Sequence, residues 1–232
     1  MTKQKKYRDS FTEGLFERIR INDRMQKKPV KMWKIRAIRP EEIYQDPTSY
    51  FDEIKVEKYA RSSGMRNAQR RIANRILELV ELDPMSGATR ILDLGCGVGY
   101  TTEVYKERGY GVVGLDINPK MLEYAIAREL SVVLGDMRNI SQLFEPNSFQ
   151  GVVSVSALQW LTQHEDIKQV AKGINYVLSD KGVGAIQFYP KSEDALDEAC
   201  RIFRREGFLT EIVTDSPENP RKRVCYLTYR KN

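Results

Sequence analysis

The stretch that decides the fold is Ile91-Leu-Asp-Leu-Gly-Cys-Gly-Val-Gly-Tyr100. It is an apolar run that contains an acid, Asp93, and continues into glycines at positions 95, 97 and 99. Glycine accepts a positive φ and lets a ligand approach the backbone, so the pattern predicts a strand, a ligand-binding turn and a helix. The G-x-G-x-x-G spacing of dinucleotide-binding proteins fails at Tyr100. Because a carboxylate at position 93 would repel a pyrophosphate but can bind an ammonium group through backbone or water, the turn favours S-adenosylmethionine.

Apolar, β-branched runs alternate with helical patterns on both sides of this turn. We expect strands at residues 90–93, 111–115, 131–134, 151–155 and 182–188, and helices at 68–82, 101–108, 119–129, 165–178 and 193–205. This rhythm predicts a Rossmann-like α/β fold, with a mostly parallel sheet and helices on both faces. Residues 208–214 and 224–229 then predict a C-terminal antiparallel hairpin. A seven-stranded sheet that ends in this way is typical of class I methyltransferases.

The charge is unevenly distributed along the chain. Residues 1–39 hold 13 Lys/Arg and 4 Asp/Glu, a net charge of +9, whereas the rest of the chain has 25 basic and 28 acidic residues. We therefore divide the sequence into a basic N-terminal extension, residues 1–49, and an α/β domain, residues 50–232. Cations set against phosphates release counterions, so the extension suits contact with RNA. A solvated arm is the alternative interpretation.

The histidine and cysteine content excludes several kinds of chemistry. His164 is the only histidine, which excludes Ser-His-Asp and Cys-His relays and His-rich metal sites. Cys96, Cys200 and Cys225 form no C-x-x-C pair, so we expect reduced thiols and no metal. No apolar run approaches the roughly 18 residues of a membrane span, and the charged start lacks the apolar stretch of a secretory signal. We expect no membrane partner and a cytoplasmic location, or a nuclear one in a eukaryote.

Two further acids follow the next two strands of the predicted sheet. Asp116 can accept both ribose hydroxyls of the cofactor, with Ile117 against the adenine. Gly135-Asp-Met137 ends the following strand, where Asp136 can accept the adenine amine and Met137 can pack on the ring. Asp is also favoured as a helix cap or turn residue, which is the alternative for Asp136. Carboxyl ends of parallel strands share one edge, so these acids predict one crevice.

Aromatic and amide side chains follow the later strands and predict the substrate pocket. Ser154-Val-Ser-Ala-Leu-Gln-Trp-Leu161 places Gln159 and Trp160 past one strand end, and Gln187-Phe-Tyr-Pro190 brings Phe188 and Tyr189 to the same rim. Aromatic faces of this kind suit a flat base, because single-stranded bases commonly stack on aromatic side chains. A Trp in the protein core is the alternative.

From Tyr50 onward the chain resembles the 18S rRNA guanine-N7 methyltransferase family of small-subunit ribosome biogenesis. The matching strings are Glu57-Lys-Tyr-Ala-Arg-Ser-Ser63, Leu92-Asp-Leu-Gly-Cys-Gly97, Gly114-Leu-Asp-Ile117 with Met121-Leu122, Leu134-Gly-Asp-Met137, Ser154 to Leu161, and Gln187 to Pro190. The resemblance implies a cofactor site of Tyr59, Asp93, Gly95, Cys96, Gly97, Gly99, Asp116, Ile117, Gly135, Asp136, Met137 and Ser154. Relatives commonly carry Arg where this chain has Gly64, so Arg61 or Arg66 is a candidate to bind the cofactor carboxylate.

The resemblance implies methylation of an in-plane lone pair. Guanine N7 is free of a proton at neutral pH, so no general base and hence no catalytic residue of that kind is expected. Two alternatives stay open: a small-molecule methyltransferase of the carboxylic acid or quinone type, and a ribosome-assembly factor that binds cofactor and pre-rRNA mainly for placement. The basic extension argues against the first, and the sequence does not separate the second from catalysis.

The strand from Leu130 to Leu134 is expected at the outer edge of the sheet on the cofactor side. Ser131, Val132 and Val133 include no Lys or Pro that would protect an exposed edge. A second protein could add a strand there. The resemblance implies a partner, a small zinc-ribbon activator protein, and the alternative is that the N-terminal extension folds over this edge.

Overall fold

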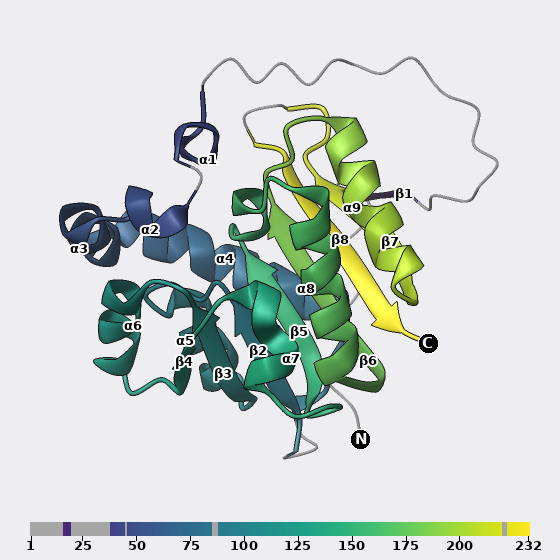
Figure 1. Cartoon of the computed structure of the whole chain (residues 1–232), viewed down its shortest axis with the longest axis horizontal. Helices are drawn as coiled ribbons and strands as arrows, with labels where there is room; N and C mark the ends of the chain where they lie inside the picture. The colour runs from purple at the N-terminus through teal and green to yellow at the C-terminus, as the bar shows by residue number, and fades with distance from the viewer. Residues whose placement is uncertain (1–15, 20–37, 45, 85–87, 220–221) are drawn as a thin grey trace, which may run out of the picture.

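The strand of the glycine-rich turn, β2 (Arg90–Leu94), lies inside an eight-stranded sheet of order β1-β7-β8-β6-β5-β2-β3-β4 (Figure 1). The computed structural model describes residues 16–19, 38–44, 46–84, 88–219 and 222–232. Strands β3 (Gly111–Asp116), β4 (Val132–Leu134), β5 (Phe149–Val155) and β6 (Leu178–Phe188) run parallel with β2. The antiparallel hairpin of β7 (Phe208–Asp215) and β8 (Val224–Lys231) continues the sheet from β6. The seven strands predicted from the sequence are confirmed.

The eighth strand comes from the N-terminal extension. β1 (Phe16–Ile19) pairs antiparallel with β7, at the end of the sheet opposite β4. The sequence analysis expected only short helices and extended pieces there, because the extension shows no sustained hydrophobic period. The rest of residues 1–37 lies outside the described part of the chain, so the expected RNA contact of the extension stays a prediction.

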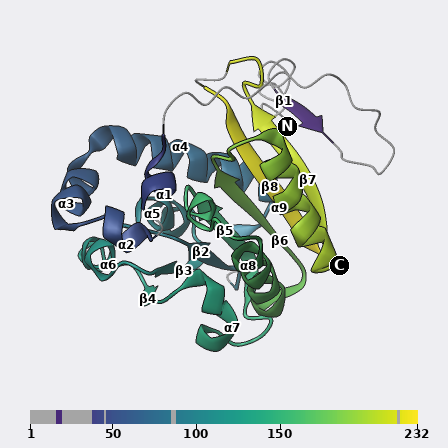
Figure 2. The same ribbon diagram turned by 45° about the horizontal axis from the view of Figure 1, so that its top comes forward.

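Helices cover both faces of the sheet (Figures 1 and 2). On one face α4 (Ser63–Val80) and α5 (Tyr100–Glu107) bury Ala73, Ile76, Val104 and Tyr105 against β2 and β5. The other face is covered by α7 (Ile140–Leu143), α8 (His164–Val177) and α9 (Glu193–Arg205), which share the larger hydrophobic cluster. Two α-helical layers around a parallel sheet direct the carboxyl ends of the strands to one crevice.

A third hydrophobic cluster attaches an N-terminal helical segment above that crevice. This segment consists of α1 (Pro40–Ile43), α2 (Pro47–Tyr50) and α3 (Glu53–Arg61). Val56 of α3 packs with Val98, Tyr100 and Met121, the last from α6 (Pro119–Ile126). Among the described residues, no helix is both long and apolar enough to cross a membrane.

Local sequence fixes the starts of these helices. Asp52 accepts a hydrogen bond from the Lys55 backbone N–H (2.9 Å) and Ser62 one from that of Met65 (3.2 Å), so one polar side chain caps α3 and another α4. Asn118 caps α6 in the same way, and Pro119 in the first turn already has the φ of a helix. These capping hydrogen bonds stabilise the helices that surround the crevice.

Candidate active site

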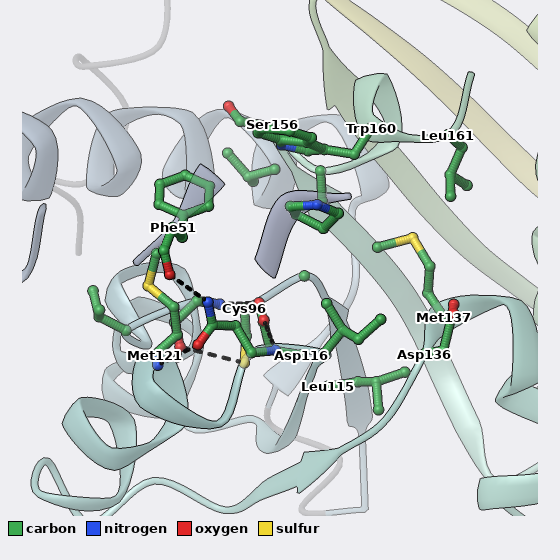
Figure 3. A pocket seen from close by; sticks show the side chains of 18 of the residues that line it. Phe51, Cys96, Leu115, Asp116, Met121, Asp136, Met137, Ser156, Trp160 and Leu161 are labelled. Carbon is green, nitrogen blue, oxygen red and sulfur yellow. Dashed lines mark hydrogen bonds between the residues drawn. The ribbon is translucent and has the colours of Figure 1, made fainter. Parts of the chain in front are cut away.

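A cavity of about 310 Å³ lies at the carboxyl ends of β2, β3, β4 and β5, beneath the N-terminal helical segment (Figure 3). Most of the predicted site residues line it, namely Tyr59, Gly95, Cys96, Gly97, Asp116, Ile117, Gly135, Asp136, Met137 and Trp160. Other predicted residues do not, namely Asp93, Gly99, Ser154, Gln159, Phe188 and Tyr189. Of the three acids predicted to form one crevice, Asp116 and Asp136 line the cavity and Asp93 does not, and the predicted aromatic rim is largely elsewhere.

The glycine turn has a shape that a side chain would prevent. Gly95 has a φ of +71°, and a Cβ built on it would lie 2.3 Å from the Cβ of Ala157. Its N–H and that of Cys96 donate to the Leu115 carbonyl, at 2.7 and 3.1 Å. These bonds hold the turn against the end of β3, so that its backbone forms the floor of the cavity.

Asp116 is oriented by the turn that it faces. The Gly97 N–H donates to Oδ2 (2.7 Å) and the Asn118 N–H donates to Oδ1 (2.9 Å). Burial raises the pKa of this carboxyl, although the N–H groups of Asn118 and Gly97 oppose the shift. Each carboxylate oxygen keeps one further lone pair, which suits the two vicinal hydroxyls of a ribose.

Asp136 is both a cap and an ion-pair partner. Its Oδ1 accepts the Arg138 backbone N–H (2.8 Å), which caps the 3₁₀ helix η2 (Met137–Asn139), and its Oδ2 accepts from the Arg138 guanidinium (2.8 Å). Burial would raise the pKa of Asp136, but the hydrogen bonds from Arg138 outweigh it and lower the pKa. The hydrogen bond from the adenine amine to Asp136 stays a prediction. The amine could use only those lone pairs of the carboxylate that Arg138 does not already occupy.

Asp93 supports the turn from below and does not reach the cavity. Its Oδ2 accepts hydrogen bonds from the hydroxyls of Thr101 (2.6 Å) and Thr102 (2.7 Å), while Oδ1 is buried with no partner among the described atoms. Asp93 therefore lies outside the cavity lining, and its predicted contact with the cofactor stays a prediction. Ser154 has a structural contact, because its hydroxyl donates to the Leu94 carbonyl (2.8 Å). Gly99 is the N-cap residue of α5 and has a φ of +85°.

The burial of Asp93 predicts a pH-dependent stability. Desolvation raises the pKa of Asp93 to about 6, despite the hydrogen bonds from Thr101 and Thr102. The folded protein therefore holds this proton more tightly than the unfolded chain, so the stabilisation is complete below the unfolded pKa and is lost as the pH rises through 6. A shift of two units corresponds to about 3 kcal/mol.

Denaturant unfolding should show this in comparison with Asp93→Asn, which does not titrate. We expect the difference in unfolding free energy between the two proteins to change by about 2 kcal/mol between pH 4 and pH 7, with the wild type relatively weaker at pH 7. A constant difference over this range would contradict the assignment.

The predicted substrate rim is corrected by the structure. Phe188 is 5% exposed and belongs to the main hydrophobic core, because the last residues of β6 are covered by helices on that face. Tyr189 is exposed but does not line the cavity, and its carbonyl accepts a hydrogen bond from Arg39. Gln159 has a buried Oε1 without a partner among the described atoms and also lies outside the lining.

The aromatic residues that meet Trp160 come instead from the N-terminal helical segment. The ring centroids of Tyr50 and Phe51 are 5.7 and 5.8 Å from that of Trp160, and Figure 3 shows Phe51 and Trp160 above the turn. The Phe51 carbonyl accepts from the Asn118 side chain (3.0 Å). Because Asp46 and Pro47 also line the cavity, the expected boundary after residue 49 does not separate the extension from the site.

A glycine turn and an acid at the carboxyl ends of parallel strands, facing one cavity, are typical of a class I S-adenosylmethionine-dependent methyltransferase. Residues 92–186 match the family described as Methyltransferase domain. The 18S rRNA (guanine-N(7))-methyltransferase of Schizosaccharomyces pombe is 33% identical over 200 residues, which cover 82% of this chain and 73% of the relative. The chain belongs to the 18S rRNA (guanine-N7)-methyltransferase family.

Solved structures share the fold at low sequence identity. Phosphoethanolamine N-methyltransferase 2 of Haemonchus contortus, in complex with phosphomonomethylethanolamine and S-adenosylhomocysteine, aligns with a TM-score of 0.62 and 18% identity, over 79% of this chain and 58% of that one. A putative methyltransferase solved with the Trm112 methyltransferase activator of Haloferax volcanii aligns with a TM-score of 0.58 and 18% identity, over 77% of this chain and 98% of that one.

Proposed function

We propose that this enzyme methylates N7 of a guanine in small-subunit rRNA during ribosome biogenesis. The observation that carries the proposal is the 33% identity, over four-fifths of the chain, to a protein named for that reaction. The cofactor supplies a methyl group activated by a sulfonium. Asp116 and the glycine turn would hold its ribose and the nearby backbone.

The chemistry of the cavity is consistent with N7 as the acceptor. The N7 lone pair needs no base, and the only histidine, His164, lies outside the cavity, where its Nδ1 is 3.0 Å from Glu198. Orientation of bound reactants can supply about 7 to 11 kcal/mol of the barrier. Positive charge moves onto the base during transfer, so the faces of Trp160 and Phe51 would stabilise it.

Labelled methyl transfer tests the substrate. Total RNA from a strain lacking the protein is incubated with the enzyme and methyl-labelled S-adenosylmethionine, and its nucleosides are separated. We expect label in 7-methylguanosine of small-subunit rRNA and none with Asp116→Ala. Label in another nucleoside, or only in carboxylic acids or quinones supplied in parallel, would contradict the proposal. Small-subunit assembly restored by Asp116→Ala in cells would show that placement, the alternative role, does not need the methyl transfer.

We also propose that a zinc-ribbon activator pairs with the edge strand β4. β4 pairs only with β3 in the described sheet, and apolar side chains around it are exposed: Ile126 by 60%, Leu134 by 56% and Leu143 by 37%. A structural neighbour solved with an activator supports such a partner. The described strand of the N-terminal extension lies at the other edge, which disfavours the extension as the cover.

A further inference from the structure

The end of the cavity near α4 has to bind an anionic group. Asp116 and Met137 are the predicted contacts of the ribose and the adenine, so the amino-acid part of S-adenosylmethionine is expected to point away from them, toward the first turn of α5 and the side of α4. That part carries a carboxylate. A carboxylate removed from water needs hydrogen-bond donors or a cation.

No described cation lines this end of the cavity. Arg138 is the one basic residue of the described lining, and it lies with Asp136 at the adenine end. The two arginines considered from the sequence lie outside the described lining and are engaged in ion pairs, Arg61 with Glu57 (2.7 Å) and Arg66 with Glu103 (2.8 Å).

A buried amide occupies this end instead. Gln69, on α4, is only 7% exposed and lines the cavity together with Tyr59 of α3. The Tyr59 ring stacks on Tyr100 (6.0 Å between centroids, 25°), and the Tyr100 hydroxyl donates to the Ala60 carbonyl (2.7 Å). Burial raises the pKa of Tyr59, so the pair is neutral.

Backbone donors lie beside this amide. Tyr100 and Thr101 line the cavity and form the first turn of α5, where N–H groups have no acceptor within the helix. A neutral amide, a hydroxyl and helix N–H groups together offer enough donors for both oxygens of a carboxylate.

We propose that the Gln69 amide binds the carboxylate of the cofactor together with the first turn of α5, in place of an arginine. The inference concerns the cofactor and is independent of the RNA substrate. Gln69 therefore sets the affinity for the amino-acid part of the cofactor and leaves the affinity for its nucleoside part unchanged.

Two ligands separate these parts in a calorimetric test. S-adenosylhomocysteine carries the amino-acid part, and 5′-methylthioadenosine lacks it. We expect Gln69→Leu to weaken binding of S-adenosylhomocysteine about 10- to 100-fold, as for loss of a hydrogen bond to a charged group, and to change binding of 5′-methylthioadenosine less than about twofold. Gln69→Glu keeps the shape of the side chain but repels a carboxylate. It should weaken binding of S-adenosylhomocysteine more than Gln69→Leu does, and it should still bind 5′-methylthioadenosine.

Arg66→Gln is the matched control on the same helix. It removes the cation but leaves the cavity lining intact, so binding of both ligands should stay near the wild-type values. Equal losses for both ligands in Gln69→Leu would show a merely structural role and overturn the proposal. It would also be overturned if Gln69→Leu and Gln69→Glu bound S-adenosylhomocysteine normally, or if Arg66→Gln weakened that ligand more than Gln69→Leu does. No RNA enters the assay, so its result does not depend on the proposed substrate.

Discussion

Asp116→Ala should weaken S-adenosylmethionine binding by about 3 kcal/mol, which corresponds to roughly 150-fold. The ribose would lose two hydrogen bonds to a charged acceptor, each worth about 1.5 kcal/mol or more. The Gly97 and Asn118 N–H groups would also lose their acceptor, so the turn beneath the cofactor would lose its orientation. Isothermal calorimetry on the purified protein measures the change directly.

Asp215→Ala is a suitable control for this variant. Asp215 is also an aspartate at a strand end, that of β7, but it accepts a hydrogen bond from Arg75 of α4 (3.3 Å) and does not line the cavity. Its replacement should leave cofactor affinity within about twofold, since no ligand contact is lost. Unchanged affinity in Asp116→Ala, or tight binding of NAD by the wild type, would reject the assignment of this site.

The sequence predicted those parts of the site that lie on strand ends of a parallel sheet. Asp116 and the glycine turn fall in the cavity because alternation of strands and helices places every carboxyl end at one edge. The order of strands and helices does not show whether a side chain at a strand end is already hydrogen-bonded to other residues. Asp93 and Asp136 were predicted as ligand groups, yet Thr101 and Thr102 bind the first and Arg138 binds the second.

Local sequence patterns did not predict which residues cover the cavity. Tyr50 and Phe51 reach Trp160 through packing of a segment that is more than 100 residues away in the chain. Gln69 gave no signal either, because a polar residue on a helix with a hydrophobic face is usually exposed. Its burial in the cavity wall is a result of tertiary packing. Phe188 was misplaced for a related reason, since only tertiary structure shows which face of β6 a terminal residue occupies.

Leu134→Pro should abolish the complex with the zinc-ribbon activator and leave the enzyme folded. In β4, the Ser131 carbonyl accepts from the Gly114 N–H (2.9 Å) and the Gly135 N–H donates to the Asp116 carbonyl (2.9 Å), both toward β3. Backbone groups alternate along a strand, so the Leu134 N–H faces the open edge. Proline there removes a donor that an added strand needs, and edge strands tolerate proline when that N–H faces solvent.

Leu134→Ala keeps the edge N–H and removes only the exposed side chain, which makes it the matched control. Val133→Pro is a poorer choice, because the N–H of Val133 faces β3 and its side chain packs against the main core. Co-expression with the activator followed by size-exclusion chromatography should give a 1:1 complex for the wild type and Leu134→Ala. Leu134→Pro should associate at least about 100-fold more weakly, so that no complex is recovered at micromolar protein concentration. A Leu134→Pro protein that still forms the complex would place the partner on another surface, and a wild type that is soluble, active and indifferent to the activator would remove the partner altogether.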